Sequence, residues 1–291
     1  MVVIDIEADE SLNEAYGESV PLVEIGPYIL KAPFDLKKLE MTLGAARDRQ
    51  EQSQGDAKFD ARKKRGARYS GTDRFTHWFS NHYLFVINLF LALYVGLPFL
   101  APVLMRANLP GVARPIYSMY GAVCHQLAFR SWFLFGEQSA YPRAAADVGD
   151  LELYGEVTGL DEADLFAARN FVGNEQIGYK VAYCQRDIAI YGAMLIFGLV
   201  FALSRRRIPS LPWYVWIGLG ILPVALDGGS QLLSQIPGFP FWEYRESTPL
   251  LRSLTGALFG LMTAWFGFPL VEESMQETRK MLAAKQQRLQ Q

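Results

Sequence analysis

Long apolar segments alternate with polar segments along most of this chain. Four apolar segments cover residues 83–105, 188–203, 211–226 and 250–271. A helix needs roughly 20 residues to cross about 30 Å of hydrocarbon, so the two shorter segments need polar ends at the interface. Runs such as IAIYGAMLIFGLVFAL are apolar on every face and lack the single stripe of a surface helix. The pattern therefore predicts four membrane-spanning helices.

The segments between and around these runs complete an all-α prediction. A moderately apolar stretch after Pro110 and Pro115 contains Cys124-His125 and predicts a re-entrant or interfacial helix. Residues 137–183 are polar and net acidic, which predicts a small cap beside the membrane. We therefore expect a polytopic membrane protein organised as a polar N-terminal tether (1–75), a four-span domain (76–272) and a helical tail (273–291).

Basic residues gather in three places that fall on the same side of these four spans. They precede the first span, fill the short turn between the second and third, and follow the fourth: Arg62-Lys63-Lys64-Arg65, Arg205-Arg206-Arg207, and Arg279 with Lys280, Lys285 and Arg288. Positively charged loops stay in the cytoplasm. The chain is thus predicted to cross the cytoplasmic membrane with both termini inside, leaving 106–187 and 227–249 outside.

Overall charge adds little, because 28 basic and 30 acidic residues give a net charge of −2. No basic stripe or stacking motif indicates nucleic-acid binding. The predicted partner is the lipid bilayer. Gly256 and Gly260, four residues apart in the fourth span, predict close helix packing and a contact with another membrane subunit or a second copy of the chain.

The two cysteines are both predicted outside, where two interpretations compete. An oxidising compartment favours a Cys124–Cys184 disulfide. Alternatively, Cys184 and Asp187 lie three residues apart and can reach one ion, with Cys124 and His125 completing four ligands of a kind that suits zinc. Free thiols are the third alternative.

The remaining polar residues at the same span ends also have two readings. Asp227 and Gln231 share one helix face, and an acid bordering a span should pair with Arg130, Arg186 or Arg252. Such pairs can lock the bundle, or the arginines can bind an anion beside Asp227 or His125 acting as acid or base. The expected substrate contacts are Gln126, Arg130, Arg186, Gln231, Arg245 and Arg252.

Four short motifs resemble DUF2085, a family of bacterial and archaeal membrane proteins. They are Cys124-His125-Gln126 with Arg130-Ser131, Cys184-Gln185-Arg186-Asp187 before Ile190-Tyr191-Gly192, Asp227-Gly228 with Gln231, and Arg252 with Thr255-Gly256. The motifs occur in the family's order and cover residues 120–270. Where the family commonly has another cysteine, this chain has Asp187. If the family's cysteines and histidine bind a metal, one thiolate ligand is therefore replaced by a carboxylate in this chain.

The resemblance implies an architecture and a site, without a reaction. One hypothesis is a membrane enzyme or binding protein for a lipid-like or anionic substrate, with or without a metal. The other is a structural or assembly subunit of a larger membrane complex, held together by a Cys124–Cys184 bridge and salt bridges. Whether the protein is an enzyme stays open at this point.

Overall fold

The computed structural model describes residues 5, 13, 17, 20–25, 27–55, 69–236, 238 and 243–290. The chain divides into two compact units, one of residues 1–74 and 284–291 and one of residues 75–283. The basic cluster Arg62–Arg65, on which part of the topology prediction rests, lies outside the described residues.

The first unit contains a hairpin and a helix where the sequence predicted only a polar tether. Strands β1 (Leu22–Ile25) and β2 (Tyr28–Lys31) pair antiparallel, and helix α2 (Leu36–Gly55) follows. Asp35 begins this helix by accepting a hydrogen bond from the Lys38 backbone N–H at 2.8 Å, as N-cap residues do.

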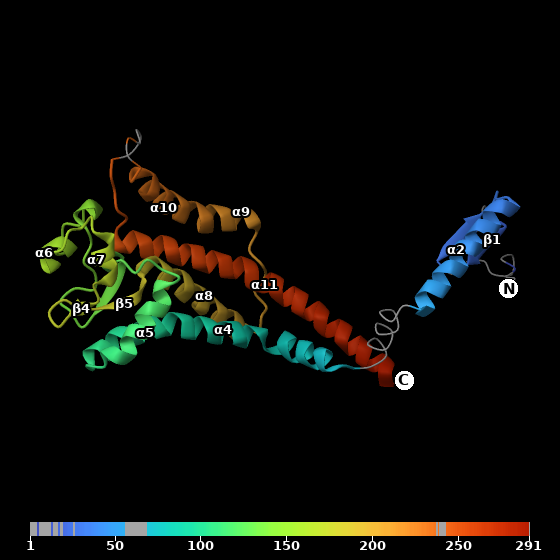
Figure 1. The fold of residues 1–291 in the computed structure, drawn as a ribbon, viewed down its shortest axis with the longest axis horizontal. Coiled ribbons are helices and arrows are strands. Elements are labelled where there is room, and N and C mark those ends of the chain that lie inside the picture. The colour runs from blue at the N-terminus through green and yellow to red at the C-terminus, as the bar shows by residue number, and fades with distance from the viewer. Residues whose placement is uncertain are drawn as a thin grey trace. The chain divides into compact units, whose positions relative to one another are not determined.

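The second unit is built on four helical segments long and apolar enough to cross a membrane, as predicted (Figure 1). Three of them are α4 (Gly71–Arg106), α8 (Gln185–Leu203) and α11 (Pro249–Gln290). The fourth is continuous and consists of α9 (Trp213–Val215), a π-helical turn (Trp216–Ile221) and α10 (Leu222–Ser234). Pro223 follows the π-helical turn directly; its missing N–H cannot continue regular bonding.

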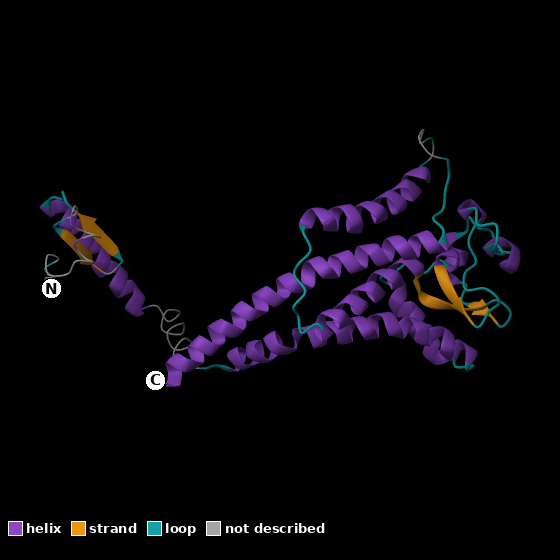
Figure 2. Cartoon of the chain, turned by 180° about the vertical axis from the view of Figure 1, so that it is seen from behind, coloured by secondary structure: helices purple, strands orange, loops and turns teal. Residues whose placement is uncertain are grey.

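A small sheet and several short helices gather at one end of this bundle (Figure 2). The sheet has the order β3-β5-β4, all antiparallel, and the sequence did not predict it. Its elements and their neighbours are α5 (Pro110–Gly121), β3 (Ser131–Leu134), α6 (Tyr154–Thr158), α7 (Leu165–Asn170), β4 (Gly173–Asn174) and β5 (Gly178–Cys184). The fold is nevertheless mostly helical, which confirms the predicted class.

Cys124 and His125 lie in the loop after α5, so the prediction that a helix carries them was wrong. Helix α5 ends at Gly121, and the chain then runs to β3. Gln126 fixes this loop, because its side-chain Nε2 donates to the Tyr117 carbonyl at 2.8 Å and to the Ala182 carbonyl at 2.7 Å.

The Gly256/Gly260 face packs against α8 of the same chain. A Cβ atom added to Gly260 would lie 2.0 Å from the Ile190 carbonyl oxygen, and one on Gly256 would lie 2.6 Å from that of Arg186. The expected close helix packing is therefore present inside the chain. The oligomer contact expected through these glycines stays a prediction, and the packing against α8 does not support it.

Replacing Gly260 by alanine is expected to separate α8 from α11. The added methyl would collide with backbone, which cannot rotate away as a side chain can, and overpacking of this kind costs about 1–3 kcal/mol. Gly267→Ala on the same helix is the matched control, because nothing lies within 4 Å of its added Cβ. Thermal unfolding in detergent should show a lower midpoint for Gly260→Ala alone; equal midpoints would contradict the packing.

Candidate functional site

Cys124, Cys184 and Asp187 form a thiol–carboxylate cluster between the sheet and α8. One ligand atom from each lies within 4.8 Å of the others, and all three side chains are half-buried. Cys184 ends β5 and directly precedes α8, while Asp187 lies in the first turn of that helix. The Cys184 Sγ donates to Asp187 Oδ2 at 2.9 Å. Two thiol sulfurs and one carboxylate oxygen, all potential metal ligands, thus converge from two separate parts of the chain.

The two thiols differ in their tendency to ionise. The adjacent Cys184 thiol lowers the pKa of Cys124 against the opposing effect of burial. The adjacent Cys124, together with burial, raises the pKa of Cys184 well above its ordinary value. Cys124 is therefore the preferred thiolate. Both cysteines are free thiols in the structure, and their proximity suits either a shared metal ion or a disulfide.

His125 does not join this cluster. Its side chain is exposed, and among the described residues the group able to hold an ion contains Cys124, Cys184 and Asp187 without a histidine. His125 follows Cys124 in an irregular loop and is therefore next to the cluster in sequence without belonging to it.

Glu246 lies in a cradle of three arginines close to the start of α11. Its carboxylate forms ion pairs with Arg130, at 2.6 Å from Nε, and with Arg143 and Arg252. Glu246 is only 3% exposed. Burial raises its pKa, but the hydrogen bond and charge of Arg130 and the charge of Arg252 outweigh burial, so the net pKa is lowered. Glu246 is consequently ionised at neutral pH.

A second buried carboxylate, Asp227, adjoins this cradle. Arg186 Nη2 lies 2.5 Å from Asp227 Oδ2, and Arg245 Nη2 lies 3.3 Å from Oδ1. The Ser247 hydroxyl donates to Oδ2 at 2.8 Å. Gln231 joins the two acids, because its Nε2 donates to Glu246 at 3.3 Å and its Oε1 accepts from the Ser247 N–H at 3.2 Å.

The combined network holds more positive than negative groups. Five arginines surround two carboxylates. Within the described part of the chain, three buried guanidinium nitrogens lack any hydrogen-bond partner: Arg143 Nε, Arg186 Nε and Arg252 Nη1. A buried donor without an acceptor costs about 1–3 kcal/mol. The network therefore holds three hydrogen-bond donors that no described group uses.

Most of the polar residues singled out in the sequence come together here, with changed roles for two of them. Asp227 meets Arg186, one of its three expected partners, while Arg130 and Arg252 meet Glu246 instead. The amides of Gln126 and Gln231, which were expected to contact substrate, bond within the protein instead. Gln126 binds two backbone carbonyls, and Gln231 binds Glu246 and the backbone N–H of Ser247.

Sequence reasoning noted Glu246 beside Arg245 at a span end but gave it no role, and it missed Arg143, Ser247 and Lys180. Lys180 is fully buried in β5, and its Nζ donates to the Gln126 carbonyl at 2.8 Å, which helps to place the loop that carries Cys124. Burial lowers the pKa of Lys180 to about 7. A lysine within an otherwise apolar or aromatic strand, YKVAY, is the one local signal that could have revealed it.

Comparisons with known proteins support the architecture. Residues 168–266 match the family model described as "Predicted membrane protein (DUF2085)". An uncharacterised protein of the archaeon Methanocaldococcus jannaschii is 24% identical over 201 residues, covering 66% of this chain and 94% of the relative. No solved structure gives a significant match. The resemblance indicated by the motifs is thus confirmed, and the chain is an integral membrane protein similar to the DUF2085 family.

Proposed function

We propose that this integral membrane protein binds zinc through Cys124, Cys184 and Asp187 and holds an anionic substrate on the neighbouring arginines. The observation that carries the proposal is the convergence of three ligand atoms within 4.8 Å. Two thiols and a carboxylate suit zinc better than the hard cations magnesium and calcium, which prefer oxygen ligands alone.

The number of protein ligands bears on what such an ion would do. Structural zinc sites are usually closed by four protein ligands, whereas catalytic sites have three and leave a position for water or substrate. This cluster supplies three. An ion there would provide Lewis-acid chemistry, and the exposed His125 is the nearest group in sequence for proton transfer. The lowered pKa of Cys124 favours ligation by its thiolate.

The surplus of arginine supports an anionic substrate. Arg186 connects the two parts of the site, since it lies one residue from Asp187 in the chain and forms the ion pair with Asp227. Three guanidinium nitrogens have no hydrogen-bond partner in the described part of the chain: the Nε of Arg186, the Nε of Arg143 and the Nη1 of Arg252. They are the donors that an anion would use. Guanidinium groups suit carboxylate and phosphate oxygens equally well.

The site is proposed to face away from the cytoplasm. Arg206 and Arg279 contact the backbone of Asn81 and Ser80, near the start of α4. The opposite end of α4 lies beside α5, where Tyr120 donates to the Tyr94 carbonyl at 2.7 Å. The arginine-rich turn and the candidate site therefore occupy opposite ends of the bundle, and positive charge favours the cytoplasmic side.

Metal content and free-thiol count, measured together on protein purified in mild detergent without chelator, test the proposal. We expect about one zinc per chain, following the one cluster of ligands, and no disulfide. No metal with two reactive thiols would contradict it. Absence of both metal and free thiols would instead establish a Cys124–Cys184 bridge.

That last outcome would favour the alternative, a structural or assembly subunit. The observation behind it is that the ion pairs join α8, α10 and α11 to the loop segments around Arg130 and Arg143. A disulfide would then add a covalent link between the α5–β3 loop and α8, and the whole network would hold the bundle rather than a ligand.

A further inference from the structure

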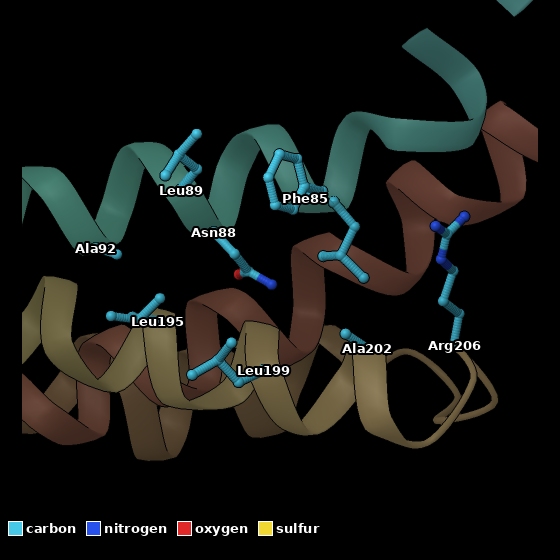
Figure 3. Close-up of a pocket in the computed structure, with 9 residues that line it drawn as sticks. Phe85, Asn88, Leu89, Ala92, Leu195, Leu199, Ala202 and Arg206 are labelled. Atoms are coloured by element: carbon cyan, nitrogen blue, oxygen red, sulfur yellow. The ribbon is translucent and has the colours of Figure 1, made fainter. Parts of the chain in front are cut away.

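A groove of about 430 Å³ lies between α4 and α8, away from the thiol–carboxylate cluster (Figure 3). Phe85 and Leu89 line one wall and Leu195 and Leu199 the other. Phe85 and Leu199 are among the exposed apolar side chains of the molecule. Because α4 and α8 are both long and apolar enough to span a membrane, a groove in their exposed surface opens toward lipid.

Two polar residues, Asn88 and Arg206, interrupt this apolar lining. Asn88 lines the groove from α4, is 7% exposed, and its Oδ1 has no hydrogen-bond partner among the described residues. Gly198 makes room for it, since a Cβ there would lie 2.0 Å from that oxygen. An unsatisfied polar group at membrane depth is costly. The amide oxygen is buried against Gly198, so it lies between α4 and α8 rather than in the open part of the groove.

Arg206 closes one end of the groove just beyond α8. Its Nη2 donates to the Asn81 carbonyl at 2.9 Å and its Nη1 pairs with Glu272 at 3.2 Å. Arg279 pairs with the same carboxylate, and the side chains of Arg205 and Arg207 are exposed beside Arg206. Four guanidinium groups thus accompany one carboxylate at this end of an apolar groove.

We propose that the groove binds one acyl chain of an anionic phospholipid, with the lipid phosphate on the arginines around Arg206. The lining from Leu84 to Ala92 extends along α4 for about 12 Å at 1.5 Å per residue, enough for a substantial part of an acyl chain. Charge selects the head group, because each arginine near an anionic membrane surface contributes about 1 kcal/mol, or roughly fivefold in affinity.

Native mass spectrometry of the full, delipidated chain with added phosphatidylglycerol or phosphatidylcholine tests this assignment. We expect wild-type protein to retain phosphatidylglycerol in preference. Leu199→Trp, which fills the groove, should abolish that preference. Ile196→Trp is the matched control, because Ile196 is also an exposed apolar residue of α8, 62% exposed against 49% for Leu199, but does not line the groove.

A charge variant separates head-group recognition from filling of the groove. Arg207→Gln removes an exposed cation without breaking the Arg206–Glu272 pair, and should weaken phosphatidylglycerol retention about fivefold. Equal retention of the two lipids by wild-type protein, or identical behaviour of the two tryptophan variants, would overturn the proposal. Thermal unfolding of each variant verifies that it is folded, so that lost retention reports on the groove.

Discussion

Glu246→Ala is expected to lower the thermal unfolding midpoint by about 10 °C, because it leaves three arginines without the carboxylate that they share. Breaking a buried ion pair by removing one partner costs about 3–5 kcal/mol, since the remaining charge stays buried and unpaired. Here the remaining charges are those of Arg130, Arg143 and Arg252, of which the last two are almost fully buried. Thermal unfolding in detergent measures the effect directly.

Glu243→Ala provides the matched control for this experiment. Glu243 lies three residues earlier on the same connection, and its side chain is exposed, so its removal should leave the midpoint unchanged. Inorganic phosphate should recover part of the stability of Glu246→Ala, because the emptied cradle presents guanidinium donors to an oxyanion. Sodium chloride at equal ionic strength should not. An unchanged midpoint for Glu246→Ala would show that the cradle contributes nothing to stability.

The membrane helices could be predicted because their signal is local. A run such as residues 188–203 is apolar on every face, and helix α8 covers it almost residue for residue. Charged residues at the ends of spans carry a similar constraint, since a buried acid there must find a cation. That constraint alone anticipated that Asp227 pairs with an arginine, and Arg186 is one of the three partners that it allowed.

The sheet escaped prediction because its strands lack the alternation that marks a half-buried strand. The β5 segment is buried on both faces over Val181, Ala182 and Tyr183, so no period of two appears in its sequence. Strand β3 is only four residues long and its register with β5 shifts between Ser131 and Phe133. Apolar runs of this length fit a helix equally well, which produced the incorrect helix around Cys124.

The role of Glu246 escaped prediction for a different reason, namely that its environment is set by distant parts of the chain. It follows Arg245 in a polar connection where a glutamate ordinarily faces water. Two of its three arginine partners, Arg130 and Arg143, are 116 and 103 residues away in sequence. No local spacing rule reports such contacts, and only the fold shows that the cradle exists.

Loss of metal binding is the largest effect that we expect from any single substitution. Cys184→Ser should reduce zinc affinity more than a hundredfold, because removal of groups that merely orient a ligand already costs 10–100-fold. Cys184 is central to the cluster, since it contacts Cys124 and donates to Asp187. Zinc content after dialysis against a weak chelator measures the loss. His125→Ala is the control, because its exposed side chain lies outside the cluster.

Asp187→Cys distinguishes the metal site from a disulfide. It introduces the thiol that is common at this position in the family that the motifs resemble. The Asp187 carboxylate already lies within 4.8 Å of both sulfurs. If Cys124, Cys184 and Asp187 bind zinc, the variant keeps one zinc per chain and binds it at least as tightly, because thiolates are strong zinc ligands. If Cys124 and Cys184 form a disulfide, the variant instead gains one free thiol and no metal. Either result separates the two chemistries, since the variant holds one zinc per chain in the first case and one free thiol without metal in the second.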